Sequence, residues 1–163
     1  VFAPLPLFNL IHETYSAYAE DYQQTFVYDV PEDLPSVWGN PDRTQQVLIA
    51  LLDNAFKYTP EGGVVTLSAC AEGDVVRVRV RDTGVGIPAA DLPHVFDRFY
   101  KVDKSHHSKG TGLGLAIAYE IMKHLGEEMS VTSEPGQGSC FTFTLHIAQR
   151  SAEQTAELPA APA

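Results

Sequence analysis

The stretch Lys109-Gly110-Thr111-Gly112-Leu113-Gly114-Leu115-Ala116-Ile117 places three glycines at alternate positions directly before an apolar helical pattern. Glycine lets the backbone approach a ligand closely and adopt a positive φ at little cost. A helix that begins here directs unpaired N–H groups and the positive end of its dipole outward, which suits phosphate. Flexible loops and tight turns use the same residues, so the motif alone is weak. The stretch predicts an anion site that the rest of the chain must support.

The charge of the chain is uneven. The 163 residues carry a formal net charge of −10, which argues against nucleic acid as a partner. Residues 98–109, however, contain four basic residues and one acidic residue, and they run directly into the glycines. A basic loop before a phosphate-type helix start favours an anionic ligand, and a merely solvated basic loop is the alternative.

Composition predicts one soluble domain with a real core, since 44% of the residues are hydrophobic. No apolar run approaches the roughly 20 residues that span a bilayer, so we expect no direct membrane contact and a cytoplasmic location, with a membrane anchor possible elsewhere in a parent protein. Val1 is not an initiator methionine, which suggests a fragment of a longer chain. Cys70 and Cys140 lie in strand-like stretches and are expected to be buried free thiols.

Hydrophobic periodicity predicts the elements in order. Residues 1–10 are expected to be a connector, and 149–163, poor in large apolar residues, a disordered tail. We expect helices at 10–22, 41–59, 89–99 and 112–125, and strands at 24–30, 64–70, 75–81, 129–133 and 139–147.

Two strands show which face is buried. Val76, Val78 and Val80 alternate with three arginines, which predicts one buried and one solvated face. In the last strand we expect Phe141, Phe143 and Leu145 to point inward and Thr142, Thr144 and His146 outward. The predicted fold is therefore α+β, a two-layer sandwich with a mixed, mostly antiparallel sheet and helices on one face.

Four blocks follow one another in a particular order. They are Asp53-Asn54-Ala55-Phe56-Lys57-Tyr58-Thr59, Asp82-Thr83-Gly84-Val85-Gly86-Ile87-Pro88, Phe96-Asp97-Arg98-Phe99-Tyr100, and the glycine stretch with Gly136-Gln137-Gly138-Ser139 after it. Each block is weak alone, but the ordered set over residues 42–147 resembles the ATP-binding catalytic domain of bacterial sensor histidine kinases. The resemblance implies the Bergerat fold of the GHKL superfamily, with ATP and Mg²⁺ as cofactors.

The resemblance assigns roles on the first block. Asn54 stands where the family holds Mg²⁺, a hard cation that prefers oxygen ligands and bridges phosphates. Lys57 lies one turn further along the same helix face, where it can meet a phosphate. Tyr58 offers an aromatic face to adenine, and core packing is the alternative reading.

The second block implies a base pocket. Asp82 matches the aspartate that accepts a hydrogen bond from the exocyclic amine of adenine, which an ionised carboxylate can do for adenine and not for guanine. Gly84 and Gly86 would let the chain pass close to the base. Ile87 would form an apolar wall.

The remaining blocks imply phosphate contacts and a lid. Lys101 stands where the family has a basic residue that reaches the phosphates, and 104–109 would form the ATP lid, with His106 and His107 as exposed polar residues. The predicted phosphate cradle is Gly110, Thr111, Gly112, Leu113 and Gly114. We interpret Phe96, Phe99 and Tyr100 as packing residues and Gly136 and Gly138 as a hairpin turn.

One position departs from the family pattern. One turn before Asn54 the family usually has a second asparagine, and gyrase-type ATPases have a glutamate that activates water, but this chain has Ala50. Alanine is neither a base nor a ligand, which weighs against a hydrolysing ATPase. A nucleotide-sensing module with weakened catalysis stays open as an alternative.

The resemblance also implies partners outside this chain. The acceptor histidine belongs to a dimerisation domain, a response regulator receives the phosphoryl group, and the parent kinase is a homodimer. His12 lacks the acceptor pattern, so no catalytic residue is assigned in this chain. The expected organisation is a linker segment and first helix at 1–22, the ATP-binding domain at 23–148 and the tail at 149–163.

Overall fold

The computed structural model describes residues 1–100 and 113–148. The elements in these ranges are α1 (Leu5–Asp21), β1 (Thr25–Asp29), α2 (Pro41–Tyr58), β2 (Val64–Glu72), β3 (Val75–Asp82), the 3₁₀ turn η1 (Leu92–His94), α3 (Gly114–His124), β4 (Met129–Glu134) and β5 (Gly138–His146). The predicted tail at 149–163 and the predicted lid lie outside the described residues.

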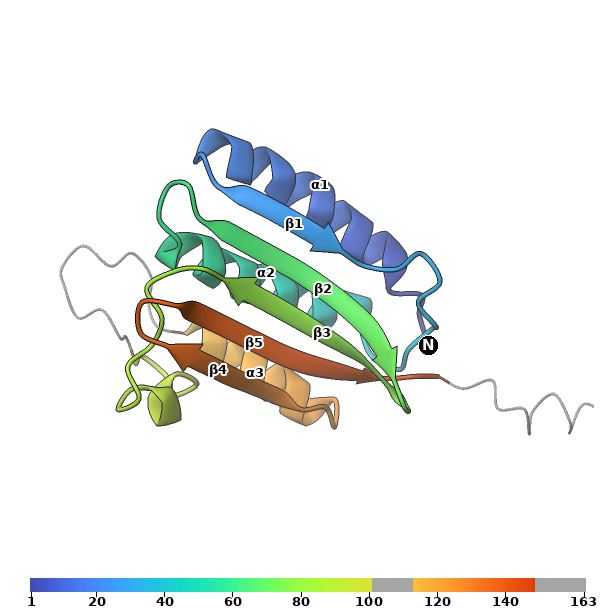
Figure 1. Cartoon of the computed structure of the whole chain (residues 1–163). Helices are drawn as coiled ribbons and strands as arrows, with labels where there is room; N and C mark the ends of the chain where they lie inside the picture. The colour runs from blue at the N-terminus through green and yellow to red at the C-terminus, as the bar shows by residue number, and fades with distance from the viewer. Residues whose placement is uncertain (101–112, 149–163) are drawn as a thin grey trace, which may run out of the picture.

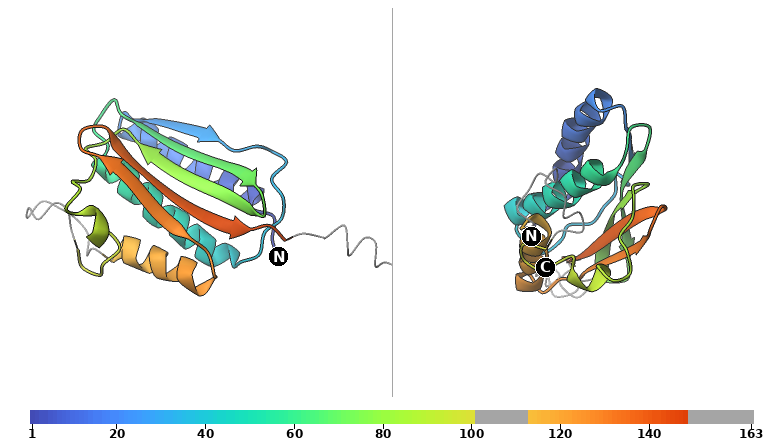
Figure 2. Two further views of the ribbon diagram at one scale, coloured as in Figure 1. Left: turned by 60° about the horizontal axis from the view of Figure 1, so that its bottom comes forward. Right: turned by 90° about the vertical axis from the view of Figure 1, so that its left-hand side faces the viewer.

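The strands form one sheet in the order β1-β2-β3-β5-β4. β1 pairs with β2 in parallel, and the other neighbouring pairs are antiparallel. The helices α1, α2 and α3 lie on one face of this sheet, and Figure 2 shows the two layers edge on. The predicted two-layer α+β fold with a mixed, mostly antiparallel sheet is confirmed.

The core lies between these layers because the buried positions follow the predicted periods. Val76, Val78 and Val80 of β3 are fully buried, and the arginines between them face outward. Helix α2 buries a stripe of Val47, Leu48, Leu51, Leu52, Ala55 and Phe56 against the sheet. It begins where Asn40 caps it, since the Asn40 side chain accepts a hydrogen bond from the Arg43 N–H at 3.1 Å.

Two element predictions are wrong in extent. α1 begins at Leu5 rather than near residue 10, and Phe8 in its first half is fully buried. Pro6 does not prevent this, because proline is tolerated in the first turn of a helix. Conversely, residues 89–99 form only the short turn η1, since Pro88 and Pro93 interrupt the segment and few residues there reach the core.

The cysteine prediction is half right. Both thiols are free, and Cys140 is buried, but Cys70 is half-buried on the outer face of the sheet. There its Sγ lies 3.3 Å from a Glu72 oxygen that belongs to a carboxylate paired with Arg77. Cys70 follows Ala69, which points into the core, so the strand period turns Cys70 outward.

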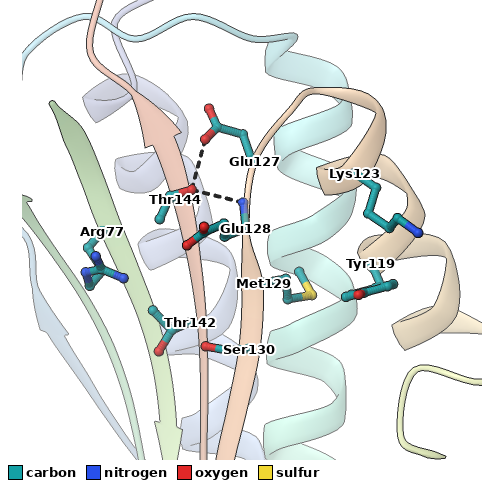
Figure 3. Close-up of a pocket in the computed structure, with 9 residues that line it drawn as sticks. All are labelled: Arg77, Tyr119, Lys123, Glu127, Glu128, Met129, Ser130, Thr142 and Thr144. Carbon is teal, nitrogen blue, oxygen red and sulfur yellow. Dashed lines mark hydrogen bonds between the residues drawn. The ribbon is translucent and has the colours of Figure 1, made fainter.

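Thr144 lies on the outer face of the sheet, as predicted, but it is buried there. The segment between α3 and β4 covers it: Glu127, with a side chain only 2% exposed, accepts a hydrogen bond from Thr144 Oγ1 at 2.9 Å (Figure 3). The same carboxylate accepts from the His146 backbone N–H at 2.6 Å and lies 2.7 Å from His146 Nδ1. Glu127 thus fastens the end of α3 to the last strand.

Replacing Glu127 with alanine is expected to lower the free energy of unfolding by about 2–3 kcal/mol, because it leaves a buried hydroxyl and a backbone N–H without their acceptor. Urea denaturation followed by circular dichroism measures this loss. Glu128→Ala is the control: that residue is exposed, so the change should stay within about 0.5 kcal/mol. Equal effects at both positions would refute the fastening role.

Candidate nucleotide site

The predicted site residues that lie within the described ranges come together at one end of the sheet. The end of α2, the end of β3, the turn between β4 and β5 and the start of α3 all lie at the left of Figure 1, and they lie toward the same side in the left-hand view of Figure 2. These four segments are far apart in the sequence. The fold therefore assembles the sequence blocks into one region.

Asp82 is the buried centre of this region. It ends β3 and is 4% exposed, and its Oδ1 accepts hydrogen bonds from the backbone N–H groups of Gly84 at 2.9 Å and Ser139 at 3.3 Å. Its Oδ2 accepts no hydrogen bond from the described residues. Burial raises the pKa of Asp82, and the two backbone hydrogen bonds oppose that rise. The two hydrogen bonds thus hold the carboxylate in a fixed orientation, and Oδ2 has no acceptor role among the described residues.

Gly84 has to be a glycine because the chain passes very close to α2 here. A Cβ at this position would lie 2.3 Å from the carbonyl oxygen of Tyr58 and 2.8 Å from Asp82 Oδ1. The next residue, Val85, donates its N–H to the same Tyr58 carbonyl at 3.3 Å. The loop after β3 is therefore fastened directly to the end of α2.

Two serines support the loop from the other side, and sequence reasoning did not assign them. Ser133 Oγ accepts from the Ile87 N–H at 2.7 Å and lies 2.9 Å from the Gly138 carbonyl and 2.8 Å from Ser139 Oγ. Ile87 is buried, as expected for an apolar wall, and Gly86 packs against the Glu134 backbone. This support depends on the register that pairs Asp82 with Ser139, which no local sequence pattern specifies.

The last turns of α2 carry the other predicted residues. Asn54 and Tyr58 are half-buried, and Lys57 is exposed with its ammonium 5.2 Å from the centre of the Tyr58 ring. Asp53 points elsewhere: its Oδ1 accepts a hydrogen bond from the Tyr15 hydroxyl at 2.6 Å, and burial raises the pKa of that tyrosine. The carboxylate nearest to Asn54 in sequence is therefore engaged with α1.

The start of α3 has the features of an anion site. Its first residue is Gly114, and among the described residues no side chain caps the N–H groups at this end, where Leu113 occupies the N-cap position. Those donors and the helix dipole are available to a phosphate. The predicted contacts Lys101, Gly110, Thr111 and Gly112 lie outside the described residues.

The segment before the lid is held on α3. Phe96 stacks on Tyr119 with ring centres 4.7 Å apart, and Arg98 forms an ion pair with Glu120 at 2.8 Å. Phe96 thus packs as expected, but Phe99 is 70% exposed with a φ of 63°, so Phe99 does not pack in the core. The Tyr100 hydroxyl donates to Asp91 and so fastens the same segment.

A cavity of about 290 Å³ lies elsewhere, beside the segment that joins α3 to β4. Figure 3 shows Tyr119 and Lys123 on one side of it and Thr142 on the other. None of the predicted nucleotide contacts lines it, and the two α3 residues that do, Tyr119 and Lys123, lie away from the start of that helix. We therefore do not assign it to the nucleotide.

Metal binding at the site would depend on few protein ligands. Residues 1–100 and 113–148 contain no cluster of three or more His, Cys, Asp or Glu side chains placed to hold a metal ion. A half-buried asparagine amide oxygen fits Mg²⁺, which commonly takes one or two protein ligands and completes its shell with phosphate oxygens and water.

In the same described ranges, no helix is both long and apolar enough to span a bilayer.

Comparison with known proteins identifies the family. The sequence pattern of the family described as histidine kinase-, DNA gyrase B- and HSP90-like ATPase matches residues 39–149. The chain therefore belongs to this family of ATPases and kinases. The match includes every segment that forms the site.

Individual relatives are sensor kinases. The chain is 45% identical over 129 residues to the adaptive-response sensory kinase SasA of Thermosynechococcus vestitus, covering 78% of this chain and 34% of that protein. It is 40% identical over 149 residues to the sensor histidine kinase RcsC of Salmonella typhimurium, covering 90% of this chain and 16% of that protein. The chain thus spans about a third or less of these relatives.

A solved structure agrees with the fold and the kinase resemblance. Full-length ShkA in complex with AMPPNP matches with a TM-score of 0.78 and 31% identity, over 90% of this chain and 31% of that one. The expected resemblance to histidine kinase catalytic domains is confirmed by both sequence and structure.

The raised pKa of Asp82 predicts how nucleotide binding depends on pH. Protonation removes the acceptor that would meet the adenine amine, so ATP affinity should fall as pH decreases through a range above the ordinary aspartate value of 3.8. The free energy of unfolding has the opposite pH dependence, because the pKa of Asp82 is higher in the folded chain than in the unfolded chain. The stability that Asp82 contributes is therefore fully present below its pKa in the unfolded chain and is lost as pH rises through its pKa in the folded chain. Titrations with ATP from pH 7.5 to 4.5 measure the first effect, and an affinity independent of pH would contradict it.

Proposed function

We propose that this chain binds ATP with Mg²⁺ and, as part of a longer sensor histidine kinase, presents the γ-phosphate to a histidine on a dimerisation domain. The observation that carries the proposal is the buried Asp82 carboxylate, held by two backbone N–H groups at the end of β3. Its Oδ2, which accepts no hydrogen bond from the described residues, can accept one from the adenine amine, and guanine presents a carbonyl oxygen at that position instead.

The other predicted site residues would bind the metal ion, the phosphates and the base. Asn54 would hold Mg²⁺, and Lys57 and the N–H groups at the start of α3 would meet the phosphates. Tyr58 and Ile87 would form the walls of the pocket around the adenine base. When bound, Mg²⁺ neutralises phosphate charge, and phosphoryl transfer depends chiefly on such positioning and neutralisation.

Steady ATP hydrolysis is not the function that this site favours. Ala50 stands half-buried one turn before Asn54, and Asp53 is bonded to Tyr15. Neither is placed to activate water, although a hydrolytic site needs a base. We infer that transfer to a protein histidine is the reaction, with a homodimeric kinase and a response regulator as the further partners.

Transfer of labelled phosphate tests the proposal. A longer protein that carries this chain after its dimerisation domain is incubated with ATP labelled at the γ-phosphate and with Mg²⁺, and acid-labile label on histidine is the expected result. Bound nucleotide without label would favour the alternative, a nucleotide-sensing module. Continuous release of phosphate without labelled protein would favour an ATPase.

A further inference from the structure

The end of α2 is held by more than helix hydrogen bonds. A helix leaves its last carbonyl groups without partners inside the helix. Here the Thr59 hydroxyl donates to the Ala55 carbonyl at 2.7 Å, and the Val85 N–H donates to that of Tyr58 at 3.3 Å. The side-chain amide of Gln24 donates to two further carbonyls, those of Phe56 at 3.0 Å and Thr59 at 2.5 Å.

Gln24 is itself fixed between α1 and β1. Its backbone N–H donates to the Ala19 carbonyl at 2.9 Å, and the neighbouring Gln23 carbonyl accepts from Gly62 at 2.8 Å. The side-chain nitrogen Nε2 therefore reaches α2 from a rigid base. Both of its hydrogens are committed to the end of that helix.

The other end of the same amide has an energetic cost. Gln24 Oε1 is buried and has no hydrogen-bond partner among the described residues. A buried acceptor without a partner costs free energy that an apolar side chain of the same length would avoid. The two donations to α2 are what a glutamine supplies here and a methionine would not.

We propose that Gln24 is a positioning residue for the candidate nucleotide site, an inference that rests on the proposed function. By holding the carbonyls of Phe56 and Thr59, it fixes the turn that presents Lys57 and Tyr58. Through the Tyr58 carbonyl, the same turn fastens the loop that follows Asp82. Gln24 touches no nucleotide and acts only through α2.

Two substitutions separate positioning from packing. Gln24→Met keeps the length and removes both donors, whereas Gln24→Glu keeps the shape and sets a carboxylate against two carbonyl oxygens. We expect MgATP affinity to fall about 3- to 10-fold in Gln24→Met and further in Gln24→Glu, whereas a packing role would leave the glutamate variant nearer to the parent. Gln23→Met is the matched control, since that side chain is exposed.

Hydrogen exchange of the unliganded protein gives the readout that a general loss of stability would not mimic. The amides of Tyr58, Thr59 and Val85 should exchange at least 10-fold faster in both Gln24 variants, while those of Leu51 and Leu52 in the middle of α2 should not change. Unchanged exchange, or faster exchange with unchanged MgATP affinity, would overturn the inference. Failure of the parent chain to bind MgATP would instead overturn the proposed function, and the exchange data would still decide whether Gln24 holds the turn.

Discussion

Asp82→Asn is expected to lower the affinity of the chain for ATP by about 100-fold or more. The amide oxygen can keep the hydrogen bonds from Gly84 and Ser139, so the NH₂ group then occupies the position of Oδ2. That group would place a donor against the donor amine of adenine. Sites built to bond a particular substrate group discriminate strongly when the match is lost.

The same variant should not lose stability. Burial raises the pKa of Asp82, so ionising this carboxyl costs more free energy in the fold than in the unfolded chain, and a neutral amide of the same shape removes that cost. We expect a midpoint of thermal unfolding equal to or above that of the parent chain. Asp74→Asn, at an exposed hairpin turn, is the control and should change neither property. Near-normal ATP affinity in Asp82→Asn would remove Asp82 from the base pocket.

Gly138→Ala is expected to destabilise the fold by about 3 kcal/mol or more and to impair nucleotide binding with it. A Cβ at this position would lie 2.0 Å from the carbonyl oxygen of Asp82, at a φ of 114° that side chains rarely adopt. The backbone of β3 would have to move where it carries the Asp82 carboxylate. Strain and overpacking of this kind each cost about 1–3 kcal/mol.

Gly136→Ala in the same turn is the matched control. Its φ is also positive, at 78°, but a Cβ there would meet nothing within 4 Å. Only the conformational cost of about 1 kcal/mol remains. Urea denaturation of both variants measures the difference, and similar losses would mean that the close approach to Asp82 does not matter.

Much of the fold could be predicted because local periodicity determines it. The valine and arginine alternation of β3 and the apolar stripe of α2 each identify a buried face without knowledge of the partner. The predictions fail where contact with a residue distant in the sequence determines whether a side chain is buried. The alternation of β5 predicts that Thr144 faces outward, yet Glu127 covers its side chain. No local sequence pattern at Thr144 indicates that contact.

The candidate site also contains residues that the sequence predicted and residues that it did not. Ordered motifs predicted Asn54, Asp82 and the glycines, because close backbone approach and a fixed carboxylate need those residue types. The supports were not predictable: Ser133 bonds the Ile87 N–H across 46 positions, and Gln24 reaches the Phe56 carbonyl across 32. Such contacts depend on strand register and on helix placement, which the sequence of either partner alone does not encode.

Calorimetric titration of the 163-residue chain with ATP and with GTP, each with excess Mg²⁺, tests the central claim most directly. The buried Asp82 carboxylate, fastened by Gly84 and Ser139, predicts saturable binding of one ATP per chain and at least 100-fold weaker binding of GTP. Equal affinities for the two nucleotides, or no heat of binding with either, would contradict an adenine-specific site at this end of the sheet.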